Sequence, residues 1–234
     1  MKKSAFTLAE TLIVMGIIGV VAALTLPNLN SSTGDKEKVA KVKKIYSNLE
    51  DAYGRATAVY GPFDEWFKND TTGEQRSKRF GERMTEFMKV SKTCGTGDGC
   101  FSSNPLLTCN GEKWTNNYLS DLKSEKTYMY ILADGTSVGF QAYNSMCRIR
   151  VDIDGPNKGR NQDGNDLFDF SISITDTQSG QNLLQLYPSI YPEIWTGNVS
   201  DLGTSYVAAW LIKNENLDYL KCSGLNWETK TSCK

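Results

Sequence analysis

The feature that most constrains this chain is an apolar run of 21 residues near its N-terminus, Phe6–Leu26, which contains one charged side chain, Glu10. As an α-helix the run is ~31 Å long at ~1.5 Å per residue, about the thickness of the hydrocarbon core of a bilayer. Lys2 and Lys3 precede it, and basic residues beside an apolar helix favour the cytoplasmic side. The pattern predicts a membrane-spanning helix with the rest of the chain on the other side.

Two ordinary explanations of this run leave Glu10 unexplained. A secretory signal peptide has an apolar stretch of ~7–15 residues before a small-residue cleavage site, whereas this run is longer and offers only a weak site at Ala22–Leu24. A plain membrane anchor has no use for an acid, because an acidic residue near the centre of a membrane helix costs ~2.5–3.5 kcal/mol. The acid therefore indicates a cationic partner.

Cleavage of the chain between Ala5 and Phe6 would supply that partner. The new α-amine of Phe6 has a reference pKa of ~7.7–8.0 and is largely cationic near neutral pH. Between two parallel helices displaced by about one turn, Glu10 of one copy would face the amine of the next. Repetition of this contact runs head to tail without closing, which predicts a helical filament.

The same residues resemble the N-terminal signature of type IV prepilins, the family of type IV pilins and of the pseudopilins of type II secretion. The resemblance covers about the first 30 of 234 residues and rests on the segment Ala5–Val14, the apolar run and Pro27. It departs from the family in having alanine where glycine usually precedes the cut. It implies a leader of residues 1–5 removed by prepilin peptidase, N-methylation of Phe6, and a role for Glu10 in assembly.

The resemblance also implies a fold and a location. The pilin fold is α+β, with a long N-terminal helix, kinked near Pro27, packed on an antiparallel sheet, and here with a disulfide-stabilised C-terminal region. The expected parts are a leader (1–5), a transmembrane and filament-core helix (6–29) and a globular domain (30–234). The precursor would lie in the bacterial inner membrane with its C-terminus in the periplasm. An inner-membrane assembly platform would then assemble copies of this subunit and other pilins into a periplasmic or cell-surface filament.

Residue patterns in the rest of the chain lead independently to the α+β class. Pro27 should kink or locally melt the first helix, and 28–34 should be flexible. From Asp35 to Gly61–Pro62, apolar residues at steps of three and four predict an amphipathic helix: Val39, Val42, Tyr46, Leu49, Tyr53 and Ala56. Ser77–Lys89 resembles a second, short helix.

Four strands are expected after these helices. Asp134-Gly135 links two β-type runs, Thr127–Ala133 and Thr136–Ala142, and such a two-residue link is a strong hairpin signal. Met146–Ile153 and Leu167–Thr175 predict two further strands. Helices followed by antiparallel strands indicate an α+β domain.

The six cysteines all lie between Cys94 and Cys233, and an even number confined to this part predicts disulfides formed outside the cytoplasm. Six cysteines allow 15 sets of three pairs. Pairing of neighbours gives the set that we expect: Cys94–Cys100, Cys109–Cys147 and Cys222–Cys233.

An acidic stretch lies between the last two expected strands. Its oxygen-rich side chains include four candidate calcium ligands, Asp152, Asp154, Asp163 and Asp166. The EF-hand pattern is absent, and some pseudopilins, which the N-terminus resembles, bind calcium in a loop near the sheet. The alternative, which we favour, is a turn-rich connection whose Asp and Asn side chains cap backbone groups. Nearby basic residues are expected to neutralise the acids: Arg148, Arg150, Lys158 and Arg160.

Two further groups of residues each permit two interpretations. Lysines gather at the start of the second helical segment, and they predict a solvated helix face, which we favour, or contact with lipid headgroups: Lys36, Lys38, Lys41, Lys43 and Lys44. The aromatic–proline stretch Tyr187–Trp195 predicts either an adhesive surface or, more commonly, a loop over the core. Trp210 and Trp227 are expected, in the same way, to cover the core from a loop.

Composition limits the classes of function. The absence of histidine excludes Ser-His-Asp and Cys-His catalysis and imidazole metal sites. A formal net charge of −1 gives no electrostatic argument for nucleic-acid binding. No acid–base pair or nucleophile stands out, so we expect no enzymatic activity. The main prediction is a structural subunit of a pilus or pseudopilus, and the alternative is a minor pilin that acts at a filament tip in adhesion or DNA uptake.

Overall fold

The computed structural model describes residues 8–113, 126–142, 146–176, 182–187, 204–227 and 229–233, with side chains omitted at 22–32, 64, 146, 173–176, 182–187 and 204–206. The chain forms two compact units, Met1–Glu37 and Lys38–Lys234. The predicted cleavage site at Ala5 and Phe6 lies outside the described residues. So does the aromatic–proline stretch, apart from the backbone of Tyr187.

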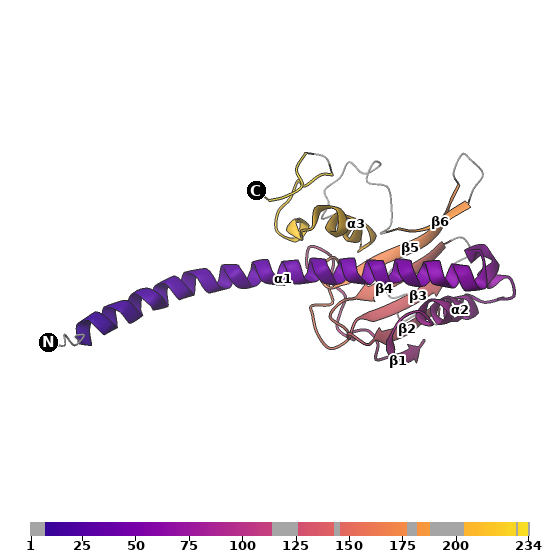
Figure 1. Ribbon diagram of the computed structural model, residues 1–234, viewed down its shortest axis with the longest axis horizontal. Coiled ribbons are helices and arrows are strands. Elements are labelled where there is room, and N and C mark those ends of the chain that lie inside the picture. Colours follow the sequence, from indigo (N-terminus) through magenta and orange to yellow (C-terminus); the bar gives the residue numbers. More distant parts are fainter. Residues whose placement is uncertain are drawn as a thin grey trace, which may run out of the picture. The chain divides into compact units, whose positions relative to one another are not determined.

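The first element is a single helix, α1 (Leu8–Tyr60), of 53 residues (Figure 1). It stays helical through Pro27 and through 28–34, so the predicted local melting is wrong, while a kink at Pro27 and the flexibility of 28–34 stay predictions. A proline removes one main-chain hydrogen bond, and a helix can continue past it when the turns on both sides are helical.

From Lys38 onward α1 buries the predicted apolar stripe. Val42, Leu49 and Ala56 are fully buried, and Tyr46 stacks on Phe170 of the sheet with ring centroids 5.7 Å apart. The helix ends where the Gly61–Pro62 signal predicts. Gly61 has a φ of 80°, a left-handed conformation that glycine adopts without a steric penalty, and its N–H donates to the carbonyl of Thr57.

The sheet is an antiparallel meander whose six strands lie in chain order (Figure 1). Four of them confirm the predicted strands: β2 (Thr127–Leu132), β3 (Ser137–Ala142), β4 (Met146–Asp152) and β5 (Leu167–Asp176). The sequence did not lead us to predict the two edge strands, β1 (Val90–Gly95) and β6 (Asn182–Tyr187). The expectation of an α+β domain with an antiparallel sheet is confirmed.

Two shorter helices complete the core. The second helix, α2 (Gly73–Thr85), begins at a capping box made by Thr72 and Gln75, and its Phe80 packs edge-on against Phe140 of β3. It is four residues earlier than the predicted start, since the box fixes its N-terminus. The third, α3 (Thr204–Asn214), contacts β5 and buries Trp210 in the same core. Trp210 packs against Trp227 and both are buried, but Trp210 lies on a helix and not on the loop that we expected.

The other face of the central strands carries buried polar groups. Strand register places Gly139, Arg150 and Asp169 in one row across β3, β4 and β5. Arg150 donates two hydrogen bonds to the carboxylate of Asp169, at 2.6 and 2.7 Å, and both side chains are 2% exposed. Arg148 lies 3.9 Å from the same carboxylate. These two arginines therefore neutralise a residue of β5, a role that we had not expected for them.

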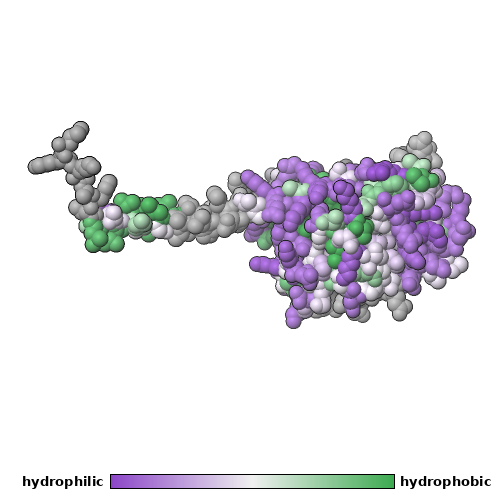
Figure 2. Space-filling model, turned by 60° about the horizontal axis from the view of Figure 1, so that its bottom comes forward, coloured by the Kyte–Doolittle hydropathy of each residue, from purple (hydrophilic) through white to green (hydrophobic). Residues whose placement is uncertain are grey.

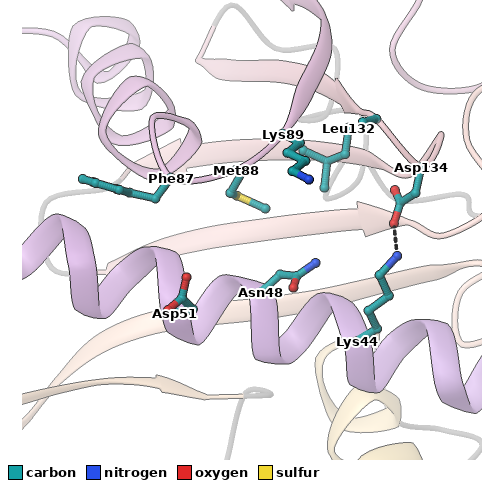
Figure 3. Close-up of a pocket in the computed structure, with 9 residues that line it drawn as sticks. Lys44, Asn48, Asp51, Phe87, Met88, Lys89, Leu132 and Asp134 are labelled. Atoms are coloured by element: carbon teal, nitrogen blue, oxygen red, sulfur yellow. Dashed lines mark hydrogen bonds and ion pairs between the residues drawn. The ribbon is translucent and has the colours of Figure 1, made fainter.

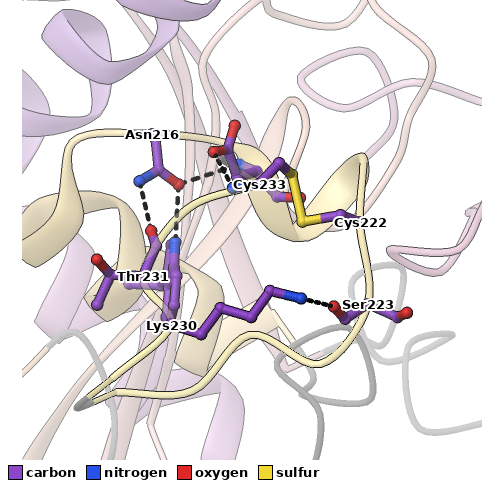
Figure 4. The surroundings of a disulfide bond; sticks show 8 residues. Asn216, Cys222, Ser223, Lys230, Thr231 and Cys233 are labelled. Carbon is purple, nitrogen blue, oxygen red and sulfur yellow. Dashed lines mark hydrogen bonds between the residues drawn. A yellow bond between two sulfur atoms is a disulfide. The ribbon is translucent and has the colours of Figure 1, made fainter.

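Two of the three predicted disulfides are formed, Cys94–Cys100 and Cys222–Cys233. The second closes the C-terminal segment, where the side-chain amide of Asn216 donates to the carbonyl of Thr231 at 3.0 Å (Figure 4). The ammonium of Lys230 donates to the carbonyl of Ser223 within the loop that this disulfide closes. The C-terminal region is thus disulfide-stabilised, as expected.

The third predicted disulfide, Cys109–Cys147, is not made. The Cys109 sulfur lies beside Gly164, whereas Cys147 pairs with Ile172 in the ladder of β4 and β5. Gly164 comes just before β5, which begins at Leu167, whereas Ile172 lies five residues further along this strand, or about 16 Å. A disulfide requires Cα atoms within about 7 Å. Burial raises the pKa of the Cys109 thiol to about 12.

Candidate functional site

The first unit contains an exposed aliphatic segment, which we define as residues 8–21 of α1. It presents nine large apolar side chains that are each more than half exposed: Leu8, Leu12, Ile13, Val14, Met15, Ile17, Ile18, Val20 and Val21. Figure 2 shows these side chains as a hydrophobic group, whereas the visible surface of the second unit is mainly hydrophilic. The aliphatic side chains surround the helix and do not form one stripe.

Glu10 is the one acid of this exposed aliphatic segment. At helical spacing it lies on the same face as Val14, Ile17 and Val21, so the carboxylate belongs to an aliphatic surface. The hydroxyl of Thr11 donates to the carbonyl of Leu8 at 2.8 Å, which satisfies that polar side chain within the helix. The structure thus places one ionisable group on an otherwise apolar, solvent-facing helix.

Within the described part of the chain, no helix meets the length and hydropathy that a membrane span requires.

The acidic loop, residues 152–166, is folded tightly around two of the predicted ligands. Asp166 is fully buried, and its two carboxylate oxygens accept backbone N–H groups of Asn161 at 2.7 Å and Gln162 at 2.8 Å. Gly159 has a φ of 79°, and a Cβ there would lie 2.2 Å from an oxygen of Asp166. Glycine is needed at this position because the backbone passes so close to the carboxylate.

Asp152 holds the start of the acidic loop in the same way. Its Oδ1 accepts the N–H groups of Asp154 at 3.1 Å and Gly155 at 3.0 Å, and its Oδ2 is buried with no hydrogen-bond partner. Burial raises the pKa of Asp152 to about 7, and the negative charges of Asp166 and Asp154 add to this effect. Burial also raises the pKa of Asp166.

This geometry agrees with the favoured interpretation, in which the acids cap backbone groups. Across the described part of the chain, no set of three or more acidic or cysteine side chains is arranged to hold a metal ion. Calcium takes 6–8 oxygen ligands, whereas the acids that the structure brings together, Asp152 and Asp166, already accept backbone N–H groups. Calcium binding by Asp152, Asp154, Asp163 and Asp166 stays a prediction, but the arrangement does not fit it well.

Four of the five predicted lysines bind loops of the domain, and the side chains of Lys41, Lys43 and Lys44 are also 40%, 39% and 61% exposed, in agreement with the favoured solvated face. Lys41 pairs with Asp154 at 3.1 Å, Lys44 with Asp134 at 2.8 Å, and Lys43 with Glu215 after α3. Lys38 donates to the side-chain oxygen of Asn165 at 2.5 Å. Burial acts to raise the pKa of Asp134, but hydrogen bonds from Lys44 and Thr136 hold it below its usual value. The lysines thus join α1 to three separate loops.

A groove of about 360 Å³ lies between α1, the α2–β1 connection and the β2–β3 turn (Figure 3). The Lys44–Asp134 pair stands at one end, and Phe87 and Asp51 stand toward the other. The lining mixes both signs of charge with apolar groups: Lys44, Asn48, Asp51, Phe87, Met88, Lys89, Leu132, Ala133 and Asp134. Two lysines and two aspartates balance each other, so the groove shows no preference for an anion or a cation.

Comparison of the chain with family models, curated proteins and solved structures found no match.

Proposed function

We propose that this chain is a structural subunit of a type IV pilus or of a type II secretion pseudopilus. In this proposal prepilin peptidase removes residues 1–5 on the cytoplasmic face of the inner membrane, and Phe6 is methylated. The mature subunit then leaves the membrane and enters a filament through its N-terminal helix. The observation that carries the proposal is the exposed aliphatic segment with a single acid, Glu10.

The size of the exposed aliphatic segment is the first argument. Burial of a Val, Leu, Ile or Met side chain is worth ~1.5–3 kcal/mol, so nine side chains that are mostly exposed represent on the order of 10 kcal/mol. This is comparable to the whole free energy of unfolding of a typical domain, ~5–15 kcal/mol. A surface of that cost requires cover from outside the chain, and a bilayer followed by a helical filament core provides it.

The second argument is the acid. Lipid and a filament core are similarly apolar, so transfer between them gains little hydrophobic free energy, and packing and polar contacts set the register. A carboxylate on an apolar helix surface is costly in either place unless a cation faces it. The α-amine of a neighbouring, cleaved copy is such a cation, and the contact repeats from copy to copy.

The proposal is tested by Glu10→Val in the native host. Membrane insertion and removal of the leader should be unchanged, because both depend on the apolar run and the cleavage site. Incorporation into sheared filaments should fall at least ~10-fold, because the register contact is lost. Quantitative immunoblots of membrane and filament fractions measure both quantities.

The matched control is Glu50→Val, which removes an exposed acid from the second half of α1. It should assemble at close to the unmodified level. Normal incorporation of the Glu10→Val chain would contradict the proposed role of this acid in assembly.

A further inference from the structure

The acidic loop brings four carboxyl groups onto one short segment, and three of them are buried. Asp152 and Asp166 are 1% and 0% exposed, and Asp154 lies between them in sequence on the same loop. Backbone N–H groups satisfy oxygens of Asp152 and Asp166, but they carry no net positive charge. Buried carboxylates of this kind ordinarily need a cation or an ion-pair partner.

Positive charge reaches the acidic loop from α1. Lys38 and Lys41 are one turn apart, so both project from one face of the helix. Lys38 contacts Asn165 at 2.5 Å and Lys41 contacts Asp154 at 3.1 Å, which places one ammonium at each end of the loop. The charge of Lys38 also acts on Asp166, where it opposes the effect of burial on the pKa.

We propose that the ammonium groups of Lys38 and Lys41 are built-in counter-ions of the acidic loop, and that the loop depends on α1 for its fold and not on a bound calcium ion. The oxygens that a calcium ion would need at Asp154 and Asn165 are the oxygens that these lysines contact. A metal ion there would have to displace both ammonium groups and would be repelled by them at short range.

A close backbone contact joins the acidic loop to the β2–β3 turn. Gly155 has a φ of 77°, and a Cβ there would lie 2.4 Å from the carbonyl oxygen of Gly135. Lys44 binds Asp134 in that same turn. One helix face therefore holds two adjacent loops through three lysines, which keeps α1 and both loops in a fixed arrangement.

The experiment is hydrogen–deuterium exchange on the full chain in detergent micelles. In the double variant K38M/K41M, the backbone amides of Asn161 and Gln162 should exchange ~5-fold faster or more, because the ammonium contacts at both ends of the loop are lost. The control is K36M, which removes an exposed lysine from the same helix and should change these rates less than ~2-fold. Exchange of the double variant at the rate of the control would overturn the proposal.

A second arm uses the unmodified chain and stands even if the double variant does not fold. The same two amides should exchange at the same rate in ~2 mM CaCl2 and in EDTA. This calcium concentration is of about the order needed to fill a weak extracellular site. If calcium slowed the exchange of these amides ~5-fold or more, the proposal would also be overturned, because the metal would then stabilise the loop.

Discussion

The two halves of α1 are one continuous helix, yet the apolar residues of one half are buried and those of the other half are exposed. In the half that follows Lys38, Val42 and Leu49 are 0% exposed and lie against the sheet. In the first half Leu12 and Met15 are 65% and 70% exposed. A helix with an apolar stripe finds its cover within its own domain, whereas a helix that is apolar on all sides requires cover on all sides. The comparison shows which part of the chain needs an external partner.

The largest expected effect compares one residue from each half. Leu49→Ala should lower the free energy of unfolding by ~2–5 kcal/mol, because it leaves a cavity under the sheet. Ile13→Ala should change it by less than ~0.5 kcal/mol, because Ile13 is 63% exposed. Urea unfolding of the full chain in micelles, followed by tryptophan fluorescence, measures both values.

Equal losses from these two substitutions would break the comparison. They would mean that the first half contributes to the folded domain as much as the second half does, and the case for an external cover would then fail.

A smaller effect concerns the second unit, where the carboxyl group of Asp152 is buried. Since the pKa of Asp152 in the folded chain is about 7 and its ordinary value is ~3.9, the folded chain holds this proton more tightly than the unfolded chain. The resulting stabilisation is complete below pH ~4 and is lost as the pH rises through 7. We expect a loss on the order of 3 kcal/mol between pH 4 and pH 7.

Asp152→Asn cannot ionise, so the free energy of unfolding of this variant should fall less steeply between pH 4 and pH 7. Chemical unfolding at several pH values provides the measurement. Parallel profiles for the unmodified chain and Asp152→Asn would show that this carboxyl does not titrate in the range expected.

Local sequence patterns predicted the central part of the fold. The Asp134-Gly135 hairpin, the strands on either side of it and the stripe of α1 each depend on a few consecutive residues, and the structure confirms them. Cys94–Cys100 and Cys222–Cys233 were predictable because each closes a short loop. The helical spacing of Val207, Trp210 and Leu211 was a usable signal for α3 that we did not exploit.

Features that depend on distant partners were not predictable in this way. β1 has three consecutive exposed residues and two irregularities in its register, so it lacks the alternation of a strand with one buried face. The lysines of α1 bind Asp134, Asp154 and Glu215, which are 90 or more residues away in sequence. No local pattern distinguishes such lysines from those of a solvated helix face.

The most direct test of the account is the intact mass of the mature protein from its native cells. The account predicts a chain that begins at Phe6 with a methylated α-amine, since only that terminus gives Glu10 of a neighbouring copy its cation. A mature chain that still carries Met1, or that begins inside the exposed aliphatic segment, would contradict it.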